Sequence, residues 1–288
     1  MSRASLAGEE SALERIEGYL DAAPRSAADA DPVGPFTLFR AHGPWQYYAR
    51  PRLGLAEPIN ADDVSRLRSR QRELGLPETI EWVFETTPSL ANAAREAGLE
   101  VAEYPLMVLD RAAFVAVAPP SGVAIRLLPH YDPEFARAHA VAAVGFSVPG
   151  TANGREGGAE RDARAASSAA ALTEFQRRRA REGWSVSAVA FGDDGPLCVG
   201  THQPVGDVTE VVGVATLPQA RRRGIGAAVT SVLVEDALAR GVETVFLSAG
   251  SEDVARVYAR LAFRTIGTAG AAEPPEPAPA RTEQRSGR

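Results

Sequence analysis

The chain has 288 residues, and its 31 cationic and 37 acidic residues give a formal net charge of −6 at pH 7. All of the cations are arginine, which excludes a lysine Schiff base and a lysine-containing phosphate loop of the G-x-x-x-x-G-K-[ST] type. The acidic balance argues against nucleic acid or an anionic membrane as a partner, and the length favours two domains.

Metal and disulfide chemistry find little support in the composition. A single cysteine, Cys198, excludes an internal disulfide and a cysteine-cluster metal site, and the four histidines are scattered without a zinc motif. No run reaches the roughly 18 apolar residues of a membrane span, and the N-terminus lacks the apolar core of a secretory signal. We therefore expect a cytoplasmic protein without a bound metal or a membrane partner.

Composition also predicts how the chain is divided. The first thirty residues are polar and alanine-rich and are expected to be flexible, with a short helix near Leu13–Leu20. A Pro-rich seam, "VAPPSG" at 117–122, predicts a boundary between two halves. The last twenty residues hold almost nothing large and apolar, so we expect them to be disordered. The predicted segments are 1–30, 31–118, 122–268 and 269–288.

The first half alternates strands and helices. Asn60 is a predicted N-cap, because it precedes two acidic residues and an apolar stripe at helical spacing, and Gly75 is the predicted end of that helix. A second, shorter helix is expected to end at Gly98. The predicted strands of this half are 45–51, 79–85 and 99–110.

The second half repeats this order at greater length. It opens with a strand at 122–129 and a helix at 134–145, followed by a Gly/Ala/Ser-rich loop at 147–170 and a helix near 171–182. Three strands lead to Pro218, and the chain then runs helix, strand, helix capped by Ser251, and strand. Both halves share the order strand, helix, strand, short helix, strand, which we interpret as a weak internal repeat.

The run Arg221-Arg222-Arg223-Gly224-Ile225-Gly226 carries the clearest chemical signal. It joins a predicted strand to an amphipathic helix, and its glycines allow the backbone to approach a ligand closely. A helix start offers unpaired N–H groups and a positive dipole end, which suit a pyrophosphate. The spacing of the glycines disfavours a dinucleotide fingerprint.

The pattern Pro218-x-x-Arg221-x-x-Gly224-x-Gly226 resembles the acyl-CoA loop of the GNAT superfamily of N-acetyltransferases. About thirty residues later, family members carry N-x-x-A-x-x-x-Y-x-x-x-G-F, and this chain matches it at two positions and departs from it at three. The corresponding residues are Ser251, Val254, Tyr258, Ala262 and Phe263. The resemblance covers about 122–268. It implies an α/β (α+β) GNAT fold, with a mixed sheet flanked by helices, in tandem with a degenerate GNAT-like copy over 31–118.

The resemblance implies a set of donor-binding residues. The strand before the loop is expected to part from its neighbour, so that free backbone groups of Val214 and Thr216 pair with the pantetheine arm of acetyl-CoA. Ser251 stands at a position where the family contacts that arm. The pyrophosphate is expected to lie on Arg221, Arg222, Arg223, Gly224, Ile225, Gly226 and Ala227.

The resemblance also implies catalytic roles. Tyr258 stands where the family places a general acid, and a phenol remains protonated at neutral pH. Glu210, in the strand before the loop, is the expected base for the incoming ammonium, and His202 is the second candidate. The first half and the 147–170 loop are expected to form the wall of the acceptor site. Glu81, Trp82 and Glu85 are candidates to face that site, although a strand tryptophan is usually a core residue.

The implied activity is transfer of an acetyl group from acetyl-CoA to a primary amine of a small molecule or peptide, by direct attack and without a metal. An alternative is a non-catalytic acyl-CoA sensor or scaffold, and a third possibility is transfer of a longer acyl group. Release of free CoA thiol with any amine would separate the enzyme from the binding module. The chain is expected to act as a monomer or homodimer.

Overall fold

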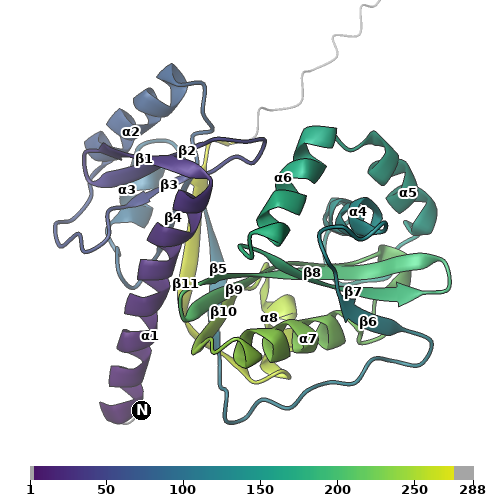
Figure 1. The fold of residues 1–288 in the computed structure, drawn as a ribbon. Helices are drawn as coiled ribbons and strands as arrows, with labels where there is room; N and C mark the ends of the chain where they lie inside the picture. The colour runs from purple at the N-terminus through teal and green to yellow at the C-terminus, as the bar shows by residue number, and fades with distance from the viewer. Residues whose placement is uncertain (1–2, 276–288) are drawn as a thin grey trace, which may run out of the picture.

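The computed structural model describes residues 3–275 and places all of its strands in one mixed sheet (Figure 1). The strand order is β1-β2-β3-β4-β11-β5-β10-β9-β8-β7-β6. The strands are β1 (Ala28–Val33), β2 (Phe36–Ala41), β3 (Ala49–Pro51), β4 (Ile80–Val83), β5 (Glu100–Leu109), β6 (Ala124–Leu127), β7 (Val186–Gly192), β8 (Gly195–Val205), β9 (Val208–Thr216), β10 (Thr244–Ser248) and β11 (Phe263–Glu273).

Helices cover the C-terminal part of this sheet on both faces. The helices are α1 (Arg3–Ala22), α2 (Ala61–Glu73), α3 (Leu90–Glu96), α4 (Phe135–Ser147), α5 (Gly158–Ser167), α6 (Ala170–Arg181), α7 (Ile225–Ala239) and α8 (Glu252–Ala259), with 3₁₀ turns η1 (Ala23–Ser26) and η2 (Pro218–Ala220). In Figure 1, α4, α5 and α6 lie on one face of β7 to β9, and α7 and α8 lie on the other. None of the described helices combines the length and apolar character that crossing a membrane requires.

The N-terminal segment is a helix, so the expectation of a flexible 1–30 was wrong. Ile16 and Tyr19 are buried, and the Tyr19 ring packs edge-on against Phe246 with ring centroids 5.1 Å apart. The free energy gained by burying these two large side chains orders the helix, which the alanine-rich composition alone did not predict. The hairpin of β1 and β2 was also not expected.

The capped helices agree with the sequence. Asn60 Oδ1 accepts the Asp63 N–H while the Asp63 carboxylate accepts the Asn60 N–H, which is a complete capping box at the start of α2. Gly75 follows the helix with φ of 66°. Ser251 Oγ likewise accepts the Val254 N–H at 3.3 Å at the start of α8. These contacts are local, and short-range patterns predicted them.

Three other expectations were wrong at their edges. Part of the expected 147–170 loop is helix α5, and the expected 45–51 strand shortens to β3. The disorder predicted from residue 269 begins too early, because β11 continues to Glu273 between β4 and β5 and gains pairing on both sides. Residues 276–288 of the predicted tail lie outside the described residues.

The two halves repeat one topology and exchange their last strands. In the first half α2 joins the parallel pair β3 and β4, and α3 leads to β5; in the second, α7 joins the parallel pair β9 and β10, and α8 leads to β11. However, β11 pairs with β4 and β5 pairs with β10. The seam at 117–122 therefore divides the sequence but not the sheet.

Candidate active site

Strands β9 and β10 part halfway along their length. The last paired position is Glu210 opposite Phe246. Beyond it, β10 is paired only with β5 on its other edge, and β9 runs on to Thr216 with no neighbour on this side among the described residues. The parting expected for the strand before the loop is therefore present.

A bulge in β9 changes which face of the sheet its side chains reach. The pairing with β8 shifts by one residue around Gly213, which takes a φ of 63°. Before the bulge, Glu210 and Val212 line a cavity on the face covered by α4 and α6, whereas after it Ala215 packs on α4. The bulge thus turns Val214 toward α7.

The backbone of β9 also presents free groups to the gap. The Leu217 N–H donates to the Leu197 C=O at 2.9 Å, which fixes the alternation of this antiparallel ladder. By that alternation the N–H and C=O of Thr216 point away from β8 and into the gap, and Val214 shares the same parity. A side-chain carbon at Gly226 would lie 3.5 Å from Thr216 Oγ1 and 3.9 Å from Val214 Cγ1, so the start of α7 borders this gap.

The start of α7 carries a run of unpaired donors. The first backbone bond of the helix is from the Ala228 N–H to the Gly224 C=O at 3.1 Å. Within residues 3–275, no acceptor meets the N–H groups of residues 222–227. Arg222 and Gly224 take φ values of 63° and 78°, and this left-handed backbone turns successive N–H groups toward one point. The start of α7 therefore offers a run of backbone donors that the described residues leave unpaired.

Arg221 differs from the expectation that it contacts a phosphate. Its guanidinium donates to the Gly145, Val148 and Ala152 carbonyls at 2.6, 2.9 and 3.1 Å. The side chain therefore ties the end of α4 to the loop after β9, and we assign it a positioning role. The guanidiniums of Arg222 and Arg223 are exposed.

Tyr258 lies below the same end of β9. Its ring packs edge-on against Phe263, with centroids 5.9 Å apart, and shares a core with Val214 and Ala227. Burial raises the pKa of the Tyr258 phenol, and the nearby Cys198 thiol adds to this. Because Cys198 lies opposite Thr216 in the sheet, the structure brings Tyr258, Thr216, Val214 and Gly226 together.

A cavity of about 940 Å³ lies between the two halves and reaches the gap at Gly213. Its lining includes residues of α1, β3, β4, β5, α4, α5, α6, β8, β9, β10 and β11, so both halves and part of the 147–170 region contribute. Its polar and charged side chains include Tyr19, Tyr47, Tyr48, Arg50, Glu81, His139, Arg164, Arg179 and Glu210. The loop at 222–227, Ser251 and Tyr258 do not line it.

Two carboxyl groups face this cavity from different halves. Burial raises the pKa of Glu210 to about 8, the Glu81 carboxylate adds to the increase, and Arg50 opposes it. Burial also raises the pKa of Glu81 to about 7, again against Arg50. A carboxyl group with a pKa near neutrality can accept a proton from a substrate and release it within one reaction cycle.

Arg50 is held by another acidic residue. It is 1% exposed, and its Nη2 donates to Glu17 Oε2 at 2.5 Å. Because α1 supplies Glu17, this helix neutralises the cation on the cavity wall and leaves Glu81 and Glu210 without a direct arginine bond among the described contacts. The sequence contained no signal for this pairing, since its residues come from separate elements.

The other candidates have structural partners. Both ring nitrogens of buried His202 are engaged, with Thr209 Oγ1 at 3.0 Å and Asp236 Oδ2 at 2.9 Å, and burial lowers its pKa. The ring does not line the cavity, which removes it as the second candidate base. Glu85 accepts the Thr268 N–H at 3.0 Å and also lies outside the lining. Glu81 does face the cavity, whereas the Trp82 ring is 2% exposed and packs in the core beside Phe84, as a strand tryptophan usually does.

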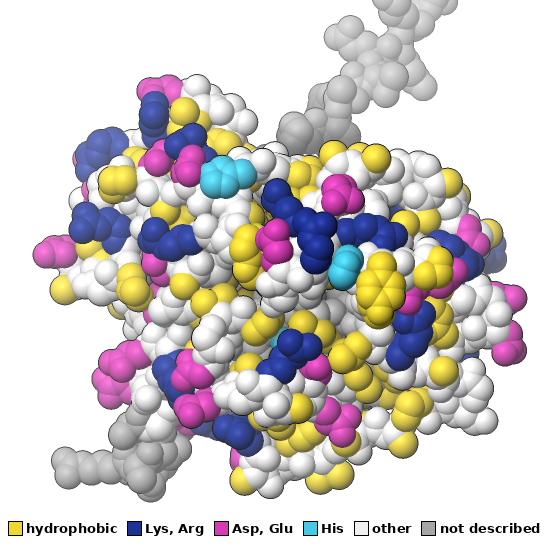
Figure 2. Space-filling model, in the orientation of Figure 1, with side chains coloured by type: hydrophobic (Ala, Val, Ile, Leu, Met, Phe, Trp, Pro, Cys, Tyr) yellow, Lys and Arg dark blue, Asp and Glu magenta, His cyan; other side chains and the backbone are white. Residues whose placement is uncertain are grey.

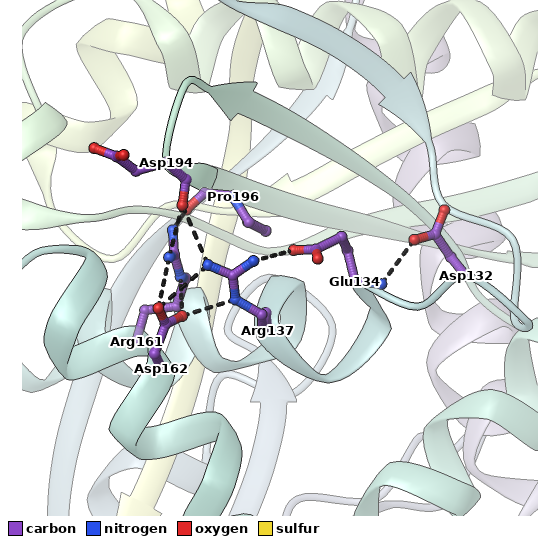
Figure 3. Close-up of polar contacts among 7 residues, drawn as sticks. All are labelled: Asp132, Glu134, Arg137, Arg161, Asp162, Asp194 and Pro196. Atoms are coloured by element: carbon purple, nitrogen blue, oxygen red, sulfur yellow. Dashed lines mark hydrogen bonds and ion pairs between the residues drawn. The ribbon is translucent and has the colours of Figure 1, made fainter.

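An ionic network fixes the wall that α4 and α5 form (Figure 3). Arg161 is 1% exposed and donates to the Pro196 and Asp194 carbonyls at 2.8 and 2.9 Å. Asp162 accepts from Arg137 Nε at 2.8 Å, and the two arginines hold the pKa of its carboxyl well below the usual range. The buried guanidinium of Arg161, with these hydrogen bonds, fixes α5 against the turn between β7 and β8.

Comparisons with known proteins agree with this geometry. Residues 164–263 match the model of the acetyltransferase (GNAT) family. No curated protein matches the chain.

Among solved structures, a GCN5-related N-acetyltransferase from Kribbella flavida has a TM-score of 0.69 at 19% identity, over 92% of this chain and 96% of that one. A putative acetyltransferase of the GNAT family from Novosphingobium aromaticivorans has a TM-score of 0.50 at 18% identity, over 88% and 92%. A tandem GNAT protein from the clavulanic acid biosynthesis pathway has a TM-score of 0.52 at 16% identity, over 83% and 78%.

At these identities the structural likenesses establish the fold, and the family match adds the sequence evidence for the domain that holds the parted strands and the loop. That family supports acyl-CoA-dependent acetyl transfer in general. Within residues 3–275 no group of three or more His, Cys, Asp or Glu side chains is arranged to hold a metal ion. Residues 164–263 thus match the acetyltransferase (GNAT) family, and the described chain has the fold of the tandem and single GNAT proteins to which it is similar.

Proposed function

We propose that this protein transfers an acetyl group from acetyl-CoA to a primary amine of a small molecule or peptide. One observation carries the proposal: the gap between β9 and β10 has unpaired N–H groups of the loop at one end and a cavity with two carboxyl groups at the other. A phosphate-bearing donor fits the first end, and a cationic acceptor fits the second.

The loop after β9 is the proposed site of the donor pyrophosphate. The N–H groups of residues 222–227 supply donors, the N-terminus of α7 supplies positive potential, and exposed Arg222 and Arg223 add charge. The groups of Val214 and Thr216 that face the gap would pair with the pantetheine arm, and Ser251 is proposed to border it. One of these N–H groups would polarise the thioester carbonyl.

The proposed reaction forms a bond from the amine nitrogen to the acetyl carbon and breaks the bond from that carbon to sulfur. Glu210 takes the proton that the ammonium must lose, which its raised pKa suits. Tyr258 gives a proton to the departing thiolate. Its buried setting keeps the phenol protonated and also raises the basicity of a thiolate in its vicinity.

The loop assignment is tested with acetyl-CoA and two variants of Gly226. A side-chain carbon fits there at ordinary contact distances, so both Gly226→Gln and Gly226→Glu are expected to fold. Acetyl-CoA should raise the melting temperature of the wild type and not that of Gly226→Glu, whose carboxylate would repel the pyrophosphate. The neutral Gly226→Gln matches the bulk and is expected to keep part of the increase, as measured by thermal shift.

Free CoA thiol released over a panel of primary amines tests the transfer itself. Release that depends on both amine and acetyl-CoA supports the enzyme. Binding of acetyl-CoA with no release on any amine would instead favour a non-catalytic acyl-CoA sensor or scaffold. Equal stabilisation of wild type and Gly226→Glu would contradict the loop assignment.

A further inference from the structure

Arg179 is a buried cation whose charge no carboxylate balances within the described residues. It lies in the last turn of α6, is 8% exposed, and lines the cavity. Its Nη1 donates to Ser26 Oγ at 3.0 Å and its Nη2 to the Trp184 carbonyl at 3.4 Å, both neutral acceptors. Desolvating a guanidinium is costly without an anion, so its burial beside a cavity points to an anionic ligand.

The surroundings hold this guanidinium in place. Its Cζ lies 5.8 Å from the Trp184 ring centroid and 5.9 Å from that of Phe175. Ser26 belongs to the turn after α1, so the contact also joins the two halves of the chain. Figure 2 shows arginine side chains gathered over α6 on this face, and Arg179 is the buried one of the three in its last turn.

The same cavity holds other polar atoms that lack partners. Four buried side-chain nitrogen or oxygen atoms have no hydrogen-bond partner in the described part of the chain. Two of them, Arg50 Nε and His139 Nε2, belong to side chains that line the cavity, whereas the Trp82 ring packs in the core beside Phe84. Because buried polar atoms are nearly always paired in folded proteins, this concentration indicates that a polar ligand belongs here.

Tyr19 interacts electrostatically with both Arg179 and Glu210, and all three residues line the cavity. Its hydroxyl donates to the Gln203 carbonyl at 2.8 Å, and Gln203 is paired with Glu210 in the sheet. Glu210 raises the pKa of Tyr19 and Arg179 lowers it, so the phenol lies within electrostatic reach of both. Tyr19, Arg179 and Glu210 all line the same cavity, so one acceptor can contact both charged groups.

We propose that the acceptor is a dipolar amine: its ammonium faces Glu81 and Glu210, and an anionic group, carboxylate or phosphate, binds the Arg179 guanidinium. The placement of the ammonium at Glu81 and Glu210 rests on the proposed function. The placement of the anionic group rests only on the buried guanidinium of Arg179. Of the other cavity arginines, Arg50 is neutralised by Glu17, and Arg164 is exposed on α5. Arg179 is therefore the cation whose burial an anion would repay.

Direct binding without acetyl-CoA tests the anion site separately from turnover. The probes are straight-chain amino carboxylates of increasing amine-to-carboxylate separation, each paired with the alkylamine of equal length, and O-phosphoethanolamine paired with ethanolamine. By isothermal titration calorimetry, we expect at least one anion-bearing amine to bind the wild type at least tenfold more tightly than its partner. A preference within the phosphate pair alone identifies phosphate as the anion.

Three variants test whether Arg179 causes the preference for anion-bearing amines. Arg179→Gln should abolish it, Arg179→Lys should retain part of it, and Arg178→Gln should leave it unchanged, because Arg178 is an exposed neighbour outside the lining. The proposal is overturned if no anion-bearing amine is preferred by the wild type, a result that needs no variant to fold, or if the preference survives in folded Arg179→Gln. Absence of thiol release with tight, Arg179-dependent binding would count against the acetyl transfer only.

Discussion

At the scale of single residues, the electrostatics of Glu210 are set by a residue from the other half of the chain. Glu81 in β4 raises its pKa, and Arg50 in β3 lowers it, while burial has the largest effect. A carboxyl group in water would be ionised at neutral pH and too weak a base to take an ammonium proton. Burial, with the charge of Glu81 in the same cavity, would suit Glu210 to the role of base in the proposed transfer.

The pH dependence of kcat/KM is expected to report this pair. Glu210 acts as a base only when ionised, so with a pKa of about 8 the rate should rise between about pH 6 and 9. Glu81→Gln removes the neighbouring negative charge, lowers the pKa of Glu210 and should move this rise to lower pH. Glu210→Gln should lower kcat/KM by about 10²-fold or more and remove the rise.

Glu85→Gln is the matched control for that profile. It alters the same kind of side chain three residues after Trp82, but Glu85 points to Thr268 and not into the cavity. Its pH profile should coincide with that of the wild type. A profile of Glu81→Gln that also coincides with the wild type would remove Glu81 from the site.

Tyr258 allows a second prediction at this scale. Tyr258→Phe keeps the ring that packs on Phe263 and removes only the hydroxyl. We expect kcat to fall by about 10²-fold, in the range for general acid catalysis, with little change in the affinity for acetyl-CoA. Steady-state kinetics with a direct binding measurement separates the two, and an undiminished kcat would assign the proton transfer to another group or to water.

At the scale of elements, one departure from the family pattern lies in the turn from α8 to β11. Ala262, where the family carries glycine, has a φ of 64°, and its carbonyl accepts the Asp110 N–H at 2.8 Å. A left-handed alanine costs about 1–2 kcal/mol. The hydrogen bond to Asp110 and the pairing of β11 hold Ala262 in this conformation. The backbone strain is therefore located in the turn and not at Tyr258.

Ala262→Gly should therefore stabilise the protein. Removal of the strain is partly offset by the larger unfolded-state entropy of glycine, about 0.4–1 kcal/mol, so we expect a net gain of at most about 1.5 kcal/mol. Ala259→Gly is the control, because Ala259 is the exposed last residue of α8 and this variant should lose stability, by at most about 0.5–1 kcal/mol. Chemical denaturation measures both, and a destabilised Ala262→Gly would contradict the strain.

At the scale of the whole molecule, the exchange of β5 and β11 joins the halves into one sheet. The two strands pair antiparallel with each other from Phe263 opposite Leu109 to Glu273 opposite Glu100, and each also pairs with the other half. Neither half can keep all its strands paired if the other unfolds. The cavity between them is consequently held open by a continuous sheet rather than by a hinge.

The chain should unfold as one cooperative unit despite its two-part sequence. We expect a single calorimetric transition whose van't Hoff and calorimetric enthalpies agree. Proteolytic cleavage engineered into the seam at 117–122 should leave the two fragments associated in solution. Two resolved transitions, or fragments that separate after cleavage, would show that the strand exchange contributes little to stability.

The sequence by itself determined the features that depend on neighbouring residues. The capping box of Asn60, the stop at Gly75 and the loop from Arg221 to Gly226 are set by short-range sterics and hydrogen bonds, and their residues stand together in the chain. The family resemblance then predicted the parting of β9 and β10. Arg221 shows the limit of such patterns, because its side chain turned to three carbonyls that the sequence could not place beside it.

Only the tertiary structure decided which distant residues meet. Glu81 and Glu210 face one cavity because β4 and β9 belong to the same sheet, and Arg179 faces it because α6 packs against the turn after α1. In the sequence, Arg179 is one arginine among several neighbours with the same local pattern. Burial separates it from them, and burial depends on packing between elements far apart in the chain.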